Sequence, residues 1–355
     1  MAFVEFKNVR VAGISAGVPS NIIDNLQGGD RFSSDYSPAE FIETTGVRER
    51  RWTHSLTTSD LCIPAAEKLI YDLGWNKEEI EAVVFVSQTA DYILPATSCI
   101  IQDRIGLPKE CFTLDISLGC SGWVHGLSVV ASLMQNGTIR RALLLVGDAK
   151  TRVIDSDPLF GHAGTATAVE YKVGESGFKF HFGTDGSGYD AIIIPDGGAR
   201  NGVSMHSFDD EQIEGKNYNR LQDRMKGMDV FSFGISTAPK SVKKLAEHYG
   251  LDYLDYDFFV FHQANMKMNN MIAKKLKLDI RKVPSSMAHF GNTSSASIPI
   301  TIVTELKDKV KNHKKFICCG FGVGLSWGTV AFDTDDLLIS DLVEVDEEKG
   351  KSKWV

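Results

Sequence analysis

The order of strand-like and helical segments repeats once along the 355-residue chain, and this repeat restricts the fold more than any other feature. In the first copy, the apolar run EAVVFVSQ (81–88) leads through a helical stretch to CFTLDIS (111–117), a second helical pattern and ALLLVGD (142–148). In the second copy, DFFVFHQA (257–264) leads to KFICCGFG (315–322). Buried strands that alternate with helices predict a layered α/β fold with mostly parallel strands.

The intervals within the two copies are nearly equal. Cys120 precedes Gly147 by 27 residues, and Asn292 precedes Gly320 by 28. The glutamine that closes the first strand of each copy lies 32 residues before Cys120 and 29 residues before Asn292. Several matched intervals in one order indicate an internal duplication with a period of about half the chain. We therefore expect Cys120 and Asn292 at equivalent strand-to-helix turns, which pseudo-symmetry would bring close together.

Composition excludes several classes of protein. The chain is 43% hydrophobic and 24% charged, as is typical of globular proteins, and its length suffices for one large or two ordinary domains. A net charge of −8 argues against a nucleic-acid binder. The N-terminus does not resemble a signal peptide, no apolar run is long enough to span a membrane, and the six cysteines form no CxxC pair. We expect a soluble cytoplasmic protein with reduced thiols, no metal site and no membrane span.

Cys120 lies in DISLGCSGWVHGL, where a strand-like run ends at a glycine and a helical pattern begins at once. The start of a helix stabilises a thiolate through its dipole and its unpaired N–H groups, so this position favours chemistry. The alternative for a lone cysteine is a small residue packed at a tight turn. His262 closes the strand before Asn292, at the carboxyl end where open α/β sheets bind ligands. A Cys, a His and an Asn can therefore meet in one pocket.

Four motifs carry a family resemblance: GCSG at 119–122, HQAN at 262–265, GNTSSAS at 291–297 and GFGVGLSWG at 320–328. Together they resemble the thiolase-fold condensing enzymes of the β-ketoacyl-acyl carrier protein synthase III type, and their order and spacing match that family from about residue 10 to residue 332. The resemblance implies an α/β fold of two βαβαβαββ halves in a five-layered α-β-α-β-α arrangement, which agrees with the duplication.

The resemblance also divides the chain. We expect an N-terminal thiolase-like half with the nucleophile at residues 1–172 and a C-terminal half with the histidine and asparagine at 173–335. The Gly- and Asp-rich segment between about 173 and 235 predicts a connection with a hairpin or two. The last stretch, 336–355, ends in a dense cluster of charges and predicts a poorly ordered tail.

The catalytic residues that the resemblance implies are Cys120, His262 and Asn292. Cys120 would take an acyl group from a thioester and hold it covalently. A malonyl thioester on acyl carrier protein would then lose carbon dioxide, and its carbanion would attack that acyl group to give a β-ketoacyl product. His262 and Asn292 would donate hydrogen bonds to the enolate oxygen, and the backbone N–H groups of Cys120 and Val323 would hold the acyl oxyanion. A complete Cys-His-Asn set favours this decarboxylative Claisen condensation over hydrolysis.

Other residues match the family's substrate and partner sites. Leu94, Phe231 and Phe321 match acyl-pocket positions, although core packing is the alternative for Phe231. Lys267, Lys274 and Lys275 match basic positions that meet the carrier protein, and a solvated helix face is the alternative. The resemblance implies a homodimer, no cofactor, and thioesters of coenzyme A or of acyl carrier protein as substrates.

The chain departs from the family's pattern around the acyl donor. The segment AEFIETTG lacks the usual tryptophan and arginine, with Glu40 and Thr44 in their approximate places, and His162 replaces an aspartate in GHAGTA. Arg152 aligns poorly with the arginine that faces the donor. These changes favour a specialised paralogue over one that uses an acetyl primer on coenzyme A. An acyltransferase that passes the Cys120 acyl group to an alcohol or amine is the alternative, and a non-catalytic partner subunit is a third.

Overall fold

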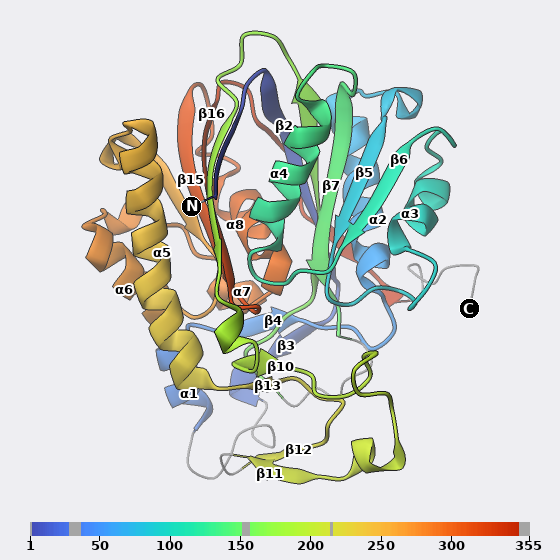
Figure 1. Cartoon of the computed structure of the whole chain (residues 1–355), viewed down its shortest axis with the longest axis vertical. Helices are drawn as coiled ribbons and strands as arrows, with labels where there is room; N and C mark the ends of the chain where they lie inside the picture. The colour runs from blue at the N-terminus through green and yellow to red at the C-terminus, as the bar shows by residue number, and fades with distance from the viewer. Residues whose placement is uncertain (1, 28–36, 151–156, 214–215, 348–355) are drawn as a thin grey trace.

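Five layers, alternately of helix and of sheet, follow one another from left to right in Figure 1. The computed structural model describes residues 2–27, 37–150, 157–213 and 216–347. A five-stranded and a seven-stranded sheet form the second and fourth layers. The helices, from left to right, are α5 (Gly227–Tyr249) with α6 (Met266–Leu276), then α4 (Gly122–Met134) with α8 (Ser297–Leu306), then α2 (Thr58–Leu73) with α3 (Thr97–Ile105). The expected five-layered α/β arrangement is confirmed.

The seven-stranded sheet contains the first copy of the repeat. Its strands are β2 (Val9–Pro19), β5 (Ala82–Val86), β6 (Phe112–Ile116), β7 (Arg141–Asp148), β8 (Ala163–Tyr171), β17 (Leu338–Ile339) and β18 (Val343–Val345). They follow the order β17-β2-β8-β7-β5-β6, and β18 also pairs with β2. β5, β6 and β7 run parallel, so their carboxyl ends meet at one edge of the sheet.

The five-stranded sheet contains the second copy. Its strands are β1 (Ala2–Phe6), β9 (Phe178–Thr184), β14 (Phe258–Phe261), β15 (Lys314–Gly322) and β16 (Ser326–Thr334), in the order β1-β9-β16-β15-β14. The order β9-β16-β15-β14 repeats the order β2-β8-β7-β5, so the sheets bear out the duplication read from the spacing. One strand differs: where β6 would have its counterpart, residues 283–286 form no strand. Pro284 within this stretch has no N–H to give to a ladder.

The central layer contributes apolar residues of α4 and α8 to the largest core cluster. Trp123, Leu127, Val130 and Met134, which the helical spacing places on one face of α4, are all fully buried between the two sheets. Trp123 satisfies its indole N–H by donating to Thr167 Oγ1 at 3.0 Å. A separate apolar cluster holds α2 and α3 against the seven-stranded sheet, and another holds α5 and α6 against the five-stranded sheet. The two sheets are therefore fixed to each other through α4 and α8.

The two ends of the chain cross to the opposite half. β1 pairs with β9 in the C-terminal sheet, while β17 and β18 pair with β2 in the N-terminal sheet. The expectation of a poorly ordered tail from residue 336 is therefore wrong as far as residue 347, and residues 348–355 lie outside the described part. The reason is that this stretch contains apolar residues as well as charged ones. Val345 is buried, and Leu338 packs against the apolar cluster that holds α2 on the seven-stranded sheet.

A smaller group of elements lies at the lower end of the sheets in Figure 1. It contains α1 (Pro38–Thr45), the antiparallel pair β3 (Ile22–Asp24) and β4 (Glu49–Arg51), and the short α7 (Met287–Phe290).

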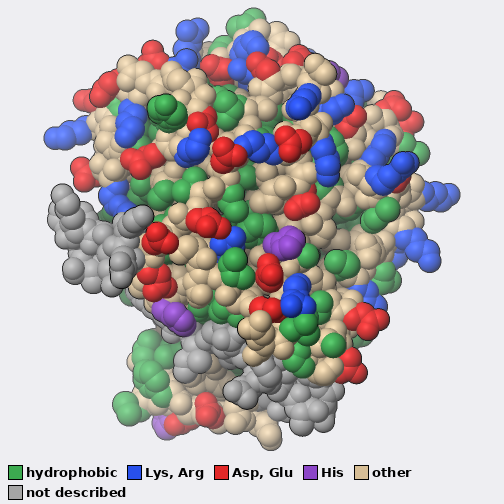
Figure 2. All heavy atoms as spheres, turned by 180° about the vertical axis from the view of Figure 1, so that it is seen from behind, with side chains coloured by type: hydrophobic (Ala, Val, Ile, Leu, Met, Phe, Trp, Pro, Cys, Tyr) green, Lys and Arg blue, Asp and Glu red, His purple; other side chains and the backbone are tan. Residues whose placement is uncertain are grey.

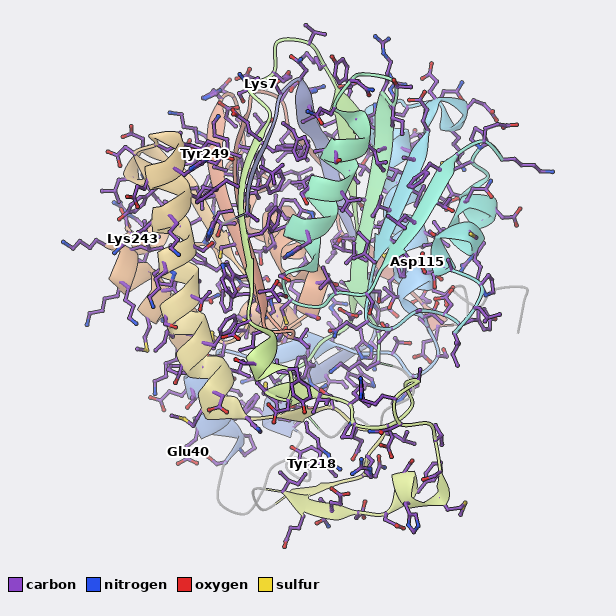
Figure 3. All side chains as sticks on the ribbon, viewed as in Figure 1. Lys7, Glu40, Asp115, Tyr218, Lys243 and Tyr249 are labelled. Carbon is purple, nitrogen blue, oxygen red and sulfur yellow. The ribbon has the colours of Figure 1, made fainter. Side chains whose placement is uncertain are left out.

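Asp115 on β6 accepts the backbone N–H groups of Thr97 at 2.7 Å and Ser98 at 2.8 Å (Figure 3). It supplies the cap that α3 does not obtain from its own first residue. No helix in the described ranges is long and apolar enough to cross a membrane.

A lobe between β9 and α5 projects at the bottom of Figure 1. It carries one hairpin, β11 (Glu211–Ile213) with β12 (Lys216–Tyr218), as the Gly- and Asp-rich sequence predicts, and a second antiparallel pair, β10 (Ile192–Ile193) with β13 (Arg224–Met225). Within the lobe, Arg220 forms an ion pair with Asp196 at 2.9 Å. Val203, Met205 and Phe208 are exposed, and Figure 2 shows hydrophobic side chains gathered on this projection.

Candidate active site

Cys120 lies in the turn between β6 and α4, two residues before the helix, where the sequence predicts it. The glycine-rich end of β15 packs directly against this turn. A Cβ atom on Gly322 would lie 2.8 Å from Cys120 Sγ, and one on Gly320 would lie 2.8 Å from the Cα atom of Ser121. The Ser121 and Ser326 hydroxyl oxygens are 2.8 Å apart. The turn of the N-terminal half is thus held against β15 and β16 of the C-terminal half, and only glycine permits the approach.

His262 follows β14 directly and is 2% exposed. Its backbone N–H donates to the Cys319 carbonyl at 2.9 Å, and its ring Nδ1 lies 2.7 Å from the Ser297 hydroxyl oxygen. Burial lowers the pKa of His262 to about 3, and a hydrogen bond with the Ser294 backbone acts in the opposite direction. The imidazole is therefore neutral near pH 7. When Ser297 donates to Nδ1, the remaining hydrogen is on Nε2, which can then act as a donor.

Asn292 lies between α7 and the 3-10 turn η8 (Ser294–Ala296), and it is 5% exposed. Its backbone N–H donates to the Leu159 carbonyl at 2.9 Å, and its carbonyl accepts from Gly161 at 3.0 Å. The side-chain Oδ1 accepts the Ser294 N–H at 2.9 Å. This leaves the amide NH₂ as the donor end of the side chain.

Ser294 joins the three residues. Its N–H donates to Asn292 Oδ1 at 2.9 Å, its side chain acts to lower the pKa of Cys120, and its backbone acts to raise the pKa of His262. Cys120, His262 and Asn292 therefore surround one residue, as the duplication predicts. Ser294 and Ser297 lie within the GNTSSAS motif, but no role was predicted for either. Their position beside Asn292 in the motif is the signal that could have identified them.

The electrostatics of Cys120 differ from what a helix start predicts. Desolvation raises the pKa of the thiol to about 11, although a hydrogen bond from the Val323 N–H favours the thiolate. The charge of Asp148 raises this pKa further, and Lys150 lowers it. The expectation of a stabilised thiolate is thus wrong for the protein without substrate, because burial outweighs the helix start. The same hydrogen bond places the Val323 N–H beside the sulfur. An acyl group on Cys120 would need a hydrogen-bond donor for its carbonyl oxygen at this position.

The three residues assigned to the acyl pocket occupy different surroundings. Phe321 alternates with Gly320 and Gly322 along β15, so it points away from Cys120 into the cluster under α5 and α6. There its ring meets the edge of the His262 ring at 5.6 Å and 84°. Phe231, in the first turns of α5, packs against the same cluster. Leu94 is 79% exposed on the loop before α3. Their part in an acyl pocket stays a prediction.

The basic residues of α6 lie on its surface. Lys267, Lys274 and Lys275 are all exposed, and the seven-residue interval from Lys267 to Lys274 places those two on one face of the helix. Lys275 Nζ donates to the Ile235 carbonyl on α5 at 3.0 Å. Asn265, the last residue of HQAN, caps α6 by accepting the Met268 N–H at 2.8 Å. The last residue of that motif therefore caps the helix that carries the lysines.

The residues that depart from the family pattern are engaged within the fold. His162 is buried, and its ring stacks on Trp52 at 3.9 Å. Its Nε2 is 3.1 Å from the Lys150 N–H, and burial lowers the pKa of the ring to about 3. Glu40 closes a capping box at the start of α1 by accepting the Ser37 N–H at 2.9 Å. Arg152 lies outside the described residues.

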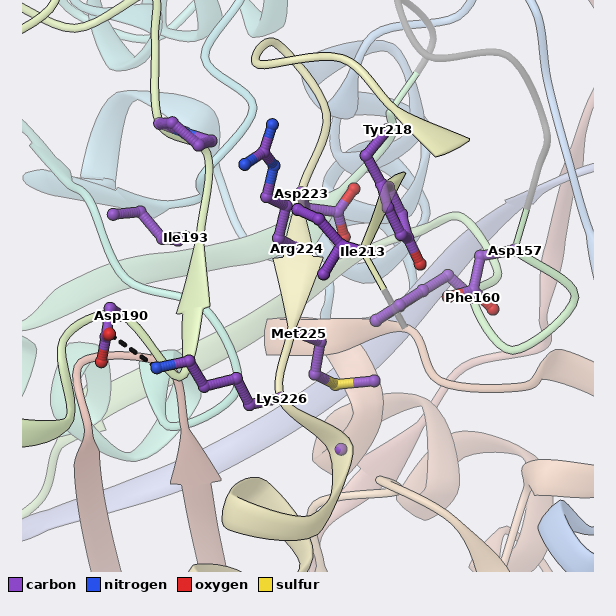
Figure 4. A pocket seen from close by; sticks show the side chains of 12 residues that line it. Asp157, Phe160, Asp190, Ile193, Ile213, Tyr218, Asp223, Arg224, Met225 and Lys226 are labelled. Atoms are coloured by element: carbon purple, nitrogen blue, oxygen red, sulfur yellow. Dashed lines mark hydrogen bonds and ion pairs between the residues drawn. The ribbon is translucent and has the colours of Figure 1, made fainter. Parts of the chain in front are cut away.

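A pocket of about 430 Å³ opens between the projecting lobe and Phe160 (Figure 4). Phe160 forms a backbone bridge with Asn292, so the pocket adjoins the site. Lys226 and Asp190 form an ion pair at 2.7 Å on its wall. The other lining residues are Asp157, Ile193, Pro195, Ile213, Tyr218, Asp223, Arg224, Met225 and Gly227. Within the described ranges, no group of three or more His, Cys, Asp or Glu side chains could hold a metal ion.

The five-layered duplicated fold, with Cys, His and Asn at its paired turns, defines a thiolase-fold condensing enzyme. The sequence model for 3-oxoacyl-[acyl-carrier-protein] synthase III matches residues 114–186, and the model for the C-terminal part of that enzyme matches residues 246–334. The chain therefore belongs to the β-ketoacyl-acyl carrier protein synthase III family.

Individual relatives agree with this assignment. The chain is 33% identical to a β-ketoacyl-acyl carrier protein synthase III of Clostridioides difficile, across 90% of this chain and 96% of that protein. It is 30% identical to a putative 3-oxoacyl-acyl carrier protein synthase 3 of Campylobacter jejuni, across 97% and 99%. A solved 3-oxoacyl-acyl carrier protein synthase of Burkholderia xenovorans superimposes with a TM-score of 0.89 at 38% identity, covering 97% of this chain and 99% of that one.

Proposed function

We propose that the protein catalyses the decarboxylative condensation of an acyl group held on Cys120 with a malonyl thioester on acyl carrier protein, giving a β-ketoacyl thioester. The observation that carries this proposal is the packing of Cys120 against Gly322 of β15, the strand whose Cys319 carbonyl accepts the His262 N–H. The relatives named above, whose names all refer to acyl carrier protein, support the same reaction and the same carrier.

The roles follow from the chemistry of each group. Cys120 attacks the donor thioester and keeps the acyl group, which divides one difficult step into two. Neutral His262 and the amide of Asn292 donate to the malonyl thioester oxygen, where charge collects as carbon dioxide leaves. The N–H groups of Cys120 and Val323 receive the acyl oxygen. No cofactor is required, because the two thioesters supply every reacting atom.

The acyl donor reaches Cys120 on a pantetheine arm, from coenzyme A or from carrier protein, and we place that arm along the pocket beside Phe160. This position is favoured by the bridge between Phe160 and Asn292. Glu40 is engaged in capping α1 and offers no aromatic surface for an adenine. This supports a specialised paralogue whose donor is held differently from the acetyl primer on coenzyme A.

We further propose a homodimer through the edge of β6 that pairs with no other strand in the described part of the chain. Phe112 and Leu114 on this edge strand are 42% and 37% exposed, and an open apolar edge favours pairing with a second copy. Leu94 would then close the acyl pocket of the partner. The exposed face of α6 with Lys267 and Lys274 is the proposed docking surface for the acidic carrier protein. A cytoplasmic location stays a prediction.

Intact-protein mass measurement after incubation with acyl thioesters of coenzyme A and of carrier protein tests the proposal. We expect one acyl adduct, absent from a Cys120→Ala variant, followed by carbon dioxide release and a longer acyl product when malonyl-carrier protein is added. An adduct that passes to an alcohol or amine without carbon dioxide release would favour the acyltransferase instead. No adduct with either carrier contradicts both.

A further inference from the structure

Asp148 is a buried carboxylate at the end of β7, and neutral donors from both halves of the molecule surround it. It is 3% exposed. From the N-terminal half, its Oδ1 accepts the Gln88 N–H at 2.8 Å and the Ser87 hydroxyl at 3.2 Å. From the C-terminal half, its Oδ2 accepts the Ser295 hydroxyl at 2.9 Å and the Ser295 N–H at 3.4 Å. These bonds offset the cost of burying a carboxylate.

Ser295 connects Asp148 to the Asn292 turn. It is the middle residue of η8, and the residue before it, Ser294, donates its N–H to Asn292 Oδ1 at 2.9 Å. The φ of Ser294 is 51°, in the left-handed region where a non-glycine residue is strained, so the turn needs contacts that hold it. The bonds from Ser295 to Asp148 supply such contacts. Asp148 therefore helps to fix the turn that presents the Asn292 amide.

Asp148 supports the Cys120 turn as well, through Gln88. A Cβ atom on Gly119 would lie 2.2 Å from Gln88 Oε1, so the Gln88 side chain packs directly against the residue before the nucleophile. The hydrogen bond from the Gln88 N–H to Asp148 holds that side chain's backbone in place. One carboxylate thus contacts the supports of both turns.

The fold by itself does not require a carboxylate at such a contact. β7 and β15 occupy equivalent places in the two sheets, and the end of each strand meets a turn of the opposite half. β15 meets the Cys120 turn with Gly320 and Gly322, whereas β7 meets the Asn292 turn with Asp148. Because glycine suffices for the first contact, the buried carboxylate at the second contact points to a role beyond packing.

We propose that Asp148 is a positioning residue for the decarboxylation step, because it sets the place of the Asn292 amide relative to Cys120. This inference rests on the proposed function, in which Asn292 donates to the malonyl thioester oxygen. Asp148 acts through Ser295 and Gln88 and exchanges no proton with the substrates. Such positioning matters because a misplacement of about 1 Å can cost about 10²-fold in rate.

The test compares carbon dioxide release from malonyl-carrier protein with acylation of Cys120 in the same preparation of each variant. In Asp148→Asn, the new NH₂ cannot accept the Ser295 N–H, so the Asn292 turn should loosen and carbon dioxide release should fall about tenfold or more. Acylation should not slow, because the charge of Asp148 raises the pKa of the Cys120 thiol and its removal favours the thiolate. Equal slowing of both reactions, or unchanged carbon dioxide release, would overturn the inference.

Ser295→Ala removes only the hydroxyl that donates to Asp148. Carbon dioxide release should fall about three- to tenfold, again without slower acylation. The double variant should be no slower than Asp148→Asn alone, since both changes break the same contact.

Thr165→Val is the matched control. The buried Thr165 hydroxyl donates to the Val146 carbonyl of β7 at 2.9 Å and to no residue of either turn in the described chain. This variant should change the ratio of the two rates by no more than about twofold, since a general loss of stability acts on both reactions alike. A change in that ratio equal to the change in Ser295→Ala would overturn the inference.

Hydrogen–deuterium exchange of residues 291–297 needs no substrate, so it separates failure of this inference from failure of the proposed function. The Ser294 and Ser295 N–H groups should exchange faster in Asp148→Asn than in wild type, because the turn has lost a contact. Unchanged exchange would overturn the inference, even in a wild-type protein that releases no carbon dioxide. Thermal unfolding checks that each variant folds. Should Asp148→Asn not fold, Ser295→Ala against Thr165→Val decides the matter by both measurements.

Discussion

The Cys120 turn and the Asn292 turn occupy equivalent places in the two halves, yet their surroundings are opposite in character. The Cys120 turn packs closely against Gly320 and Gly322 of β15, and burial removes its sulfur from water. The second is rich in hydroxyl groups, with Ser294, Ser295 and Ser297 each in a hydrogen bond. One copy of the repeat thus presents a nucleophile and the other presents donors. The contrast teaches that a duplicated turn can supply two halves of one reaction because the sheet geometry brings them together.

Removing the nucleophile should have the largest effect. Cys120→Ala should show no acyl adduct and lose at least about 10³-fold in condensation rate. It should still release carbon dioxide from malonyl-carrier protein within about tenfold of wild type, because the donors of the Asn292 turn remain. Intact mass and a carbon dioxide assay measure the two reactions. Cys99→Ala, at an exposed cysteine, is the control. Equal loss of condensation and of carbon dioxide release would show that the two turns do not have separate roles.

Changing the other turn should produce the reverse pattern. Asn292→Asp replaces the donor NH₂ with an acceptor, so decarboxylation should fall about 10²–10³-fold. Acylation of Cys120 should fall much less. Stopped-flow acylation and carbon dioxide release are compared in the same preparation. Asn76→Asp is the matched control, because Asn76 caps an exposed 3-10 turn and aspartate caps equally well. A larger loss in acylation than in decarboxylation contradicts the division of roles.

Crowding the contact between the turn and β15 should have an intermediate effect. Gly322→Ala would place a methyl group 2.8 Å from Cys120 Sγ, and such overpacking costs about 1–3 kcal/mol. We expect acylation to slow about tenfold or more and the thermal unfolding midpoint to drop. Gly186→Ala, whose added atom would meet nothing within 4 Å, should change neither. Normal acylation in Gly322→Ala would mean that the turn can move away from β15.

The prediction with the smallest expected effect on activity concerns the dependence of stability on pH. The pKa values of His262 and His162 are lowered to about 3 in the folded protein, so below about pH 6.5 the unfolded chain binds protons that the folded protein does not. The free energy of unfolding should therefore decrease as pH falls from 6.5 toward 3, by up to about 1.4 kcal/mol per pH unit for each histidine. Urea unfolding at pH 7 and pH 5 measures it. His262→Gln should flatten this dependence, and a slope unchanged in that variant contradicts the assignment.

Much of the fold could be predicted because local patterns encode it. The runs read as strands became β5, β6, β7, β14 and β15, and the apolar spacing after Cys120 became α4. The spacing of apolar residues and the length of an apolar run are read from neighbouring residues in the sequence alone. The C-terminal strands β17 and β18 were missed because their pairing depends on the edge of β2, more than 300 residues earlier.

The candidate site shows the same division between sequence and structure. By itself, the sequence determined the duplication, the turns that carry Cys120 and Asn292, and the family to which their motifs point. Only the tertiary structure decided that burial raises the pKa of the thiol, that Phe321 faces away from it, and that the charge of buried Asp148 acts on it. The physical reason is that burial and hydrogen-bond partners are set by residues distant in sequence, and the shift of a pKa from its ordinary value depends on those neighbours.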